Sequence, residues 1–60
     1  MTTLTYADLV IIRYALLERE VRLVEDLRRR GLETSDELED LGLVIDRVTR
    51  AIEIDLRRTA

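Results

Sequence analysis

Carboxylates are the side chains that gather most densely in this 60-residue chain, so they are the first candidates for chemistry. Four of them lie within residues 36–40: Asp36, Glu37, Glu39 and Asp40. Carboxylate oxygens bind divalent cations, but the calcium loops of EF-hands also need a central glycine, which this stretch lacks. Negative charge is favourable in the first turn of a helix. We therefore interpret the cluster as a helix start and expect no metal site.

Other catalytic groups are missing from the sequence. The chain has no cysteine and no histidine, so neither a cysteine–histidine nor a serine–histidine pair can be assembled. The Glu-x-x-His motif of helical-bundle metal centres cannot occur, and there is no glycine-rich phosphate loop. We expect a protein that is not an enzyme and that uses no cofactor.

Composition and charge narrow the remaining classes. Hydrophobic residues make up 47% and charged residues 38% of the chain, with two glycines and no proline, which is typical of long amphipathic helices. A net charge of −3 disfavours general attraction to nucleic acids or anionic membranes. The start "MTTLTYADL" has no basic region, and the apolar run after it is too short to span a bilayer. We expect a cytoplasmic protein without a membrane partner.

The choice of basic residue hints at an origin. All ten basic residues are arginine, and lysine, asparagine and phenylalanine, which have AT-rich codons, are absent. This pattern favours a GC-rich genome, such as that of an actinobacterium or of one of its phages. In a phage, the protein would be a viral protein acting in the host cytoplasm.

The first predicted helix covers about residues 5–30. Thr5 and Asp8 have the spacing of a capping box at its start. Residues 28–30 are arginines, which favour the last turn of a helix. Gly31 follows at the position where helices end in a left-handed conformation.

The second predicted helix covers about residues 35–58, after a turn at 31–34. Thr34 and Glu37 have the spacing of a second capping box. So short a connection makes the helices antiparallel neighbours, and we expect one helical hairpin over residues 1–60. Gly42 lies in the middle of the second helix, where we expect it to mark a close approach of the two backbones.

The first helix has more apolar surface than the hairpin can cover. At 100° per residue its apolar sector is about 200° wide, whereas one neighbouring helix needs about 100°. A chain this short is also marginal as a monomer. We therefore predict a homodimer, or a higher homo-oligomer, in which two hairpins form a four-helix bundle.

Arg13 interrupts the most apolar stretch, "LVIIRYALL". Arg13 and Glu20 lie on one line of the helix, so two first helices packed antiparallel about a two-fold axis would place each beside the other's opposite charge. The alternative is that both side chains simply extend to water. The predicted self-association interface consists of Leu9, Ile12, Arg13, Leu16, Leu17, Glu20 and Leu23.

Leu43 and Ile54 lie off the apolar face of the second helix. They are either ordinary exposed residues or a surface for another protein. The main interpretation is thus a protein–protein interaction module of unknown function, such as a regulator, an inhibitor or an assembly subunit.

The alternative interpretation is a nucleic-acid-binding protein. In chain length, turn position and apolar pattern, the sequence resembles the plasmid copy-number Rop proteins, whose dimeric four-helix bundle binds RNA. No specific motif is shared, so no residue is carried over. The single basic run, Arg28 to Arg30, is surrounded by acidic residues, and we do not expect nucleic acid as the partner.

Overall fold

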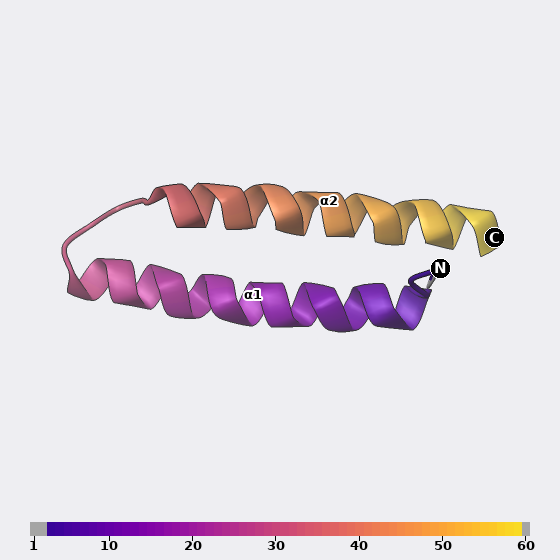
Figure 1. Cartoon of the computed structure of the whole chain (residues 1–60), viewed down its shortest axis with the longest axis horizontal. Coiled ribbons are helices and arrows are strands. Elements are labelled where there is room, and N and C mark those ends of the chain that lie inside the picture. The colour runs from indigo at the N-terminus through magenta and orange to yellow at the C-terminus, as the bar shows by residue number, and fades with distance from the viewer. Residues whose placement is uncertain (1–2, 60) are drawn as a thin grey trace.

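Two antiparallel helices lie side by side in the structure, a computed structural model that describes residues 3–59 (Figure 1). Helix α1 is Tyr6–Arg29 and helix α2 is Asp36–Thr59. The predicted all-helical hairpin is confirmed, with helix ends close to the expected ones. The connecting residues 30–35 lie at one end of the hairpin, and both chain ends lie at the other. Within the described residues neither helix has an apolar stretch long enough to cross a membrane.

The predicted capping box at the start of α1 is confirmed. Thr5 Oγ1 accepts from the backbone N–H of Asp8 at 3.2 Å, and Asp8 Oδ2 accepts from the backbone N–H of Thr5 at 2.9 Å. These two bonds satisfy donors that have no partner inside the helix. The Thr5 backbone N–H, and then its side chain, hold the pKa of Asp8 below its ordinary value of 3.8.

Helix α1 ends at a left-handed glycine, as the sequence predicted. Gly31 has a φ of 73°, in the left-handed region that glycine adopts without steric cost. The backbone N–H of Leu32 donates to the Leu27 carbonyl at 2.8 Å, and that of Gly31 donates to the Arg28 carbonyl at 3.1 Å. This pair of bonds is a Schellman motif, which reverses the chain toward α2.

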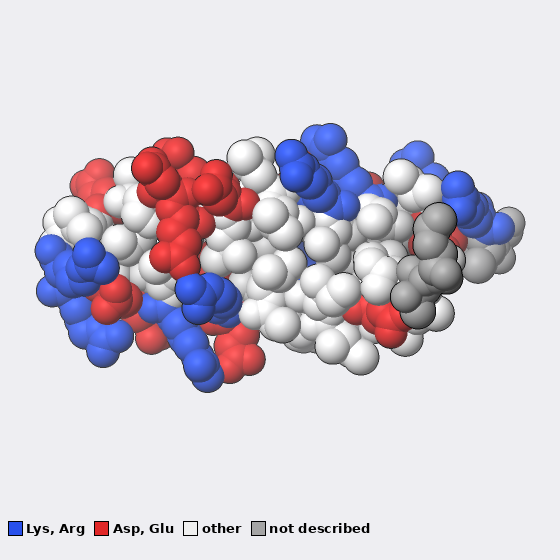
Figure 2. Space-filling view, in the orientation of Figure 1, with Lys and Arg blue, Asp and Glu red and all other residues white. Residues whose placement is uncertain are grey.

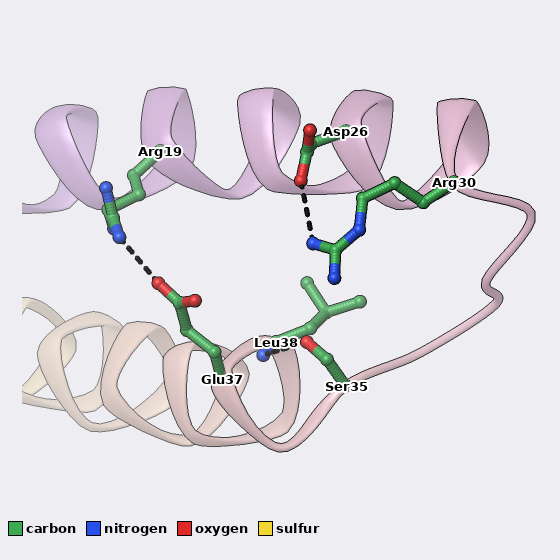
Figure 3. Close-up of polar contacts among 6 residues, drawn as sticks. All are labelled: Arg19, Asp26, Arg30, Ser35, Glu37 and Leu38. Carbon is green, nitrogen blue, oxygen red and sulfur yellow. Dashed lines mark hydrogen bonds and ion pairs between the residues drawn. The ribbon is translucent and has the colours of Figure 1, made fainter.

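The predicted cap of α2 is wrong by one residue. The hydroxyl of Ser35, not that of Thr34, accepts from the backbone N–H of Leu38 at 3.2 Å, as Figure 3 shows. The N-cap hydroxyl bonds the N–H of the second or third helical residue. Because α2 begins at Asp36, Ser35 is the residue at that position.

Packing between the helices is shallow. Leu27, with 2% of its surface exposed, is the single buried residue among residues 3–58. The hairpin measures 45 × 22 × 14 Å, and its radius of gyration is 14.1 Å, against about 10 Å for a compact domain of this length. The described part of the chain is therefore one elongated layer of two helices with little buried interior.

Gly42 does not mark a close approach of backbones, contrary to the expectation from sequence. A Cβ atom built on Gly42 would meet nothing within 4 Å. The facing helix in this hairpin therefore does not require glycine at this position.

Ion pairs follow both helices on their exposed sides. Three pairs join residues four apart within one helix, namely Arg22–Glu18 at 2.7 Å, Arg30–Asp26 at 3.1 Å and Arg50–Asp46 at 3.2 Å. A further pair, Arg19–Glu37 at 2.5 Å, connects the two helices (Figure 3). Exposed pairs of this kind contribute about 0–1 kcal/mol each, so they add little to the stability of the hairpin.

Candidate functional site

Arg13 lies between the helices and is half-buried. Its Nε–H donates to Thr49 Oγ1 at 3.0 Å, and the Thr49 hydroxyl donates in turn to the Ile45 carbonyl at 2.8 Å. The threonine thus links the guanidinium of α1 to the backbone of α2. Thr49 was not among the predicted site residues, although a hydroxyl in line with Ile45 and Ile52 on the apolar face of α2 was a signal for a polar partner.

Glu20 lies on the same line of α1 two turns further on, and it is also half-buried. Within residues 3–59 its carboxylate takes part in no ion pair and no hydrogen bond of the structure. A carboxylate partly removed from water is costly unless it has a partner. Arg13 still has four N–H donors besides Nε, and within the described residues its only hydrogen bond is the one to Thr49.

Two neighbouring rows of side chains run along α1, each with the alternating spacing of three and four residues that helix packing uses. The inner row faces α2 and is half-buried or buried throughout: Leu9, Arg13, Leu16, Glu20, Leu23 and Leu27. The outer row contains no charge: Val10, Tyr14, Leu17, Val21 and Val24. In the outer row Tyr14 is 71% exposed and Val21 is 56% exposed. The hairpin therefore covers the row with charges and leaves the fully apolar row partly open to water.

The residues of the predicted self-association interface are all half-buried in the hairpin: Leu9, Ile12, Arg13, Leu16, Leu17, Glu20 and Leu23. Five of them belong to the inner row, and Leu17 belongs to the outer row. Their role in self-association stays a prediction. The other predicted surface is open, because Leu43 is 59% exposed and Ile54 is 54% exposed.

A groove opens between the helices near the chain ends, with a volume of about 260 Å³. It is lined by Tyr6, Val10, Arg13, Tyr14, Thr49, Ile52 and Glu53. Ligand pockets usually measure about 300–1,000 Å³, so this groove is small for a cofactor or substrate. Its polar groups include no nucleophile–base pair, and residues 3–59 contain no cluster of three side chains able to hold a metal ion.

Charge is unevenly spread along the hairpin. Figure 2 shows one face, on which acidic and basic side chains gather over the half nearest the turn, while uncharged surface covers much of the middle. The acidic residues at the start of α2 and the arginines at the end of α1 belong to the charged half. The two signs lie close together there, and further basic side chains lie over the C-terminal half of α2 on this face.

Comparison with protein-family models, with curated protein sequences and with solved structures gave no match.

Proposed function

We propose that this chain is a non-enzymatic, self-associating helical module in which two hairpins pack into a four-helix bundle. The observation that supports the proposal is the large solvent-accessible surface area of the single hairpin. A folded monomer of 7.0 kDa exposes about 4,000 Å², whereas this hairpin exposes 5214 Å². The excess of about 1,200 Å² is more than the roughly 800 Å² that each partner buries in a standard interface.

The architecture supports the same proposal. Stable domains are built from at least two packed layers around a core, and two helices provide one layer. Disulfides and histidine or cysteine metal sites are ruled out as alternative reinforcement by the composition. A second copy of the same chain would supply the second layer.

Sedimentation equilibrium at micromolar concentration tests the proposal. We expect a mass of twice the 7.0 kDa of the chain, with a helical circular dichroism signal that does not change over the same concentrations. A helical species with the mass of one chain would contradict it.

The biological role that we propose for such a module is to bind another protein, as a regulator, inhibitor or assembly subunit in an actinobacterium or a phage. Leu43 and Ile54, two exposed residues of α2, are the proposed contact residues. To test this role, the chain and its Leu43→Glu variant are each purified from host lysate, and a partner protein should be lost with the variant. Arg47→Glu is the control for added negative charge on α2. Co-purification of RNA instead, with affinity that falls steeply with salt, would favour the alternative of an RNA-binding bundle.

A further inference from the structure

The outer row of α1 identifies the surface through which the proposed dimer would form, an inference that rests on the proposed function. We infer that two copies pack α1 against α1, antiparallel, with a two-fold axis between Tyr14 and Leu17. The second layer of the bundle then covers the apolar row that the hairpin leaves open.

The spacing of the outer row selects this axis. The outer row alternates steps of three and four residues. In antiparallel packing of such a row, the first residue of a three-residue step contacts the second residue of such a step in the partner helix. With the axis between Tyr14 and Leu17, each Tyr14 contacts Leu17 of the second copy and each Val10 contacts Val21. Moving the axis toward Val21 would set Arg28 against Val10, which would bury a charge at both ends of the interface. The chosen register keeps all central contacts apolar.

The two half-buried charges of the inner row support a second copy as the occupant. Arg13 and Glu20 flank the outer row on the same side. In the proposed register Arg13 of each chain lies beside Glu20 of the other, because a two-fold axis makes such contacts reciprocal. The second copy thus supplies a cation to the carboxylate that has no partner within residues 3–59. Arg13 can accept this role without losing its bond to Thr49, since only its Nε–H is engaged there.

The groove near the chain ends fits the same arrangement. Val10 and Tyr14 line it, and these two residues meet Val21 and Leu17 of the second copy in the proposed register. Aliphatic side chains of the second copy therefore close the groove, which is too small for a typical ligand.

Charge substitutions in the outer row test the interface. Tyr14 and Val21 are exposed within the hairpin, so Tyr14→Glu and Val21→Glu leave the contacts between α1 and α2 in place. In sedimentation equilibrium we expect each to raise the dimer dissociation constant at least about a hundredfold, because a carboxylate would be buried without a partner. Leu43→Glu is the matched control, with a similarly exposed apolar residue on α2, and should leave the constant within about threefold.

The possible failures are distinguishable. If the unmodified protein is a monomer, the proposed function fails and the interface with it. If it is a dimer that Leu43→Glu dissociates while Tyr14→Glu does not, self-association stands and the outer row is the wrong surface.

Disulfide trapping gives a second measurement that does not depend on stability. The chain has no cysteine, so every disulfide comes from an introduced residue. Mixing Tyr14→Cys chains with Leu17→Cys chains and oxidising them should give mainly the mixed disulfide. A dominant homodisulfide of Tyr14→Cys or of Leu17→Cys would exclude the proposed register. In a separate oxidation of Leu43→Cys chains, efficient formation of the homodisulfide would place the interface on α2. Either result would overturn the inference.

Discussion

Arg13 and Thr49 are 36 residues apart in the sequence and are joined by a 3.0 Å hydrogen bond across the hairpin. The bond explains how an arginine is accommodated inside the most apolar stretch of the chain. Thr49 is not left with an unmatched hydroxyl, because its own proton goes to the Ile45 carbonyl. The contact fixes the position of α1 along α2 in a way that apolar side chains alone do not.

Removing the hydroxyl of Thr49 should therefore weaken the fold. We expect Thr49→Val to lower the free energy of unfolding by about 1–2 kcal/mol, because a half-buried charged donor loses its acceptor. Thr49→Ser, which keeps the hydroxyl, should lose less. Urea unfolding at fixed protein concentration measures both. Thr34→Val, at an exposed turn residue, is the control and should change stability by less than about 0.5 kcal/mol. Equal effects of the two valine variants would mean that Arg13 satisfies its donors with water.

The two glycines should respond to alanine in opposite directions. Gly31→Ala should destabilise the protein by about 1–2 kcal/mol, because alanine is strained in the left-handed region, where Gly31 lies with a φ of 73°. Gly42→Ala should stabilise it by up to about 1 kcal/mol, because glycine is a poor helix former and the added methyl meets nothing within 4 Å. Thermal or urea unfolding distinguishes the two. A loss of stability at Gly42 would reveal that a neighbour outside the hairpin occupies the space beside it.

Asp8 should make the start of α1 sensitive to acid. Its pKa is lowered in the folded chain by bonds from Thr5, so the carboxylate form is favoured by folding. The resulting stabilisation is complete above the ordinary pKa of 3.8 and is lost as the pH falls through the lower folded value. We expect Asp8→Asn to be less stable than the unmodified protein at neutral pH and to approach it in acid. A constant stability difference over this pH range would contradict the assignment.

The pair between Arg19 and Glu37 should add little. Both side chains are largely exposed, so a double-mutant cycle with Arg19→Ala and Glu37→Ala should give a coupling of about 0.2–1 kcal/mol. The coupling should fall as salt is raised, since surface charges are screened. The pair Arg22–Glu18 within α1 is a matched comparison, in which the same ion types interact without joining the helices. A coupling much above that of the comparison pair would show that Arg19 and Glu37 help to hold the hairpin closed.

Local signals in the sequence predicted the helices well, because they act over a few residues. The capping box of Thr5 and the left-handed Gly31 belong to this kind. The cap of α2 was harder to place, because Thr34 and Ser35 are adjacent and both are good caps.

The choice between the two rows of α1 was not predictable in the same way. Both rows have helical spacing and both are rich in apolar residues, so the periodicity gives a wide sector without saying which part faces α2. The decision depends on contacts between distant residues, such as the Arg13–Thr49 bond. The expected close approach at Gly42 failed for the same reason, since it depended on a register that local patterns do not set.

The single connection at residues 30–35 also determines the order in which the hairpin can form. Contacts beside the turn close short loops, as for Arg19 and Glu37, which are 18 residues apart, whereas Arg13 and Thr49 are 36 apart. The entropy lost on closing a loop rises with its length. Contacts between the two helices should therefore form first near Gly31 and then progressively toward the chain ends. The open end of the hairpin should fray first, and backbone amides near Ile52 should exchange hydrogen with water faster than those near Leu27.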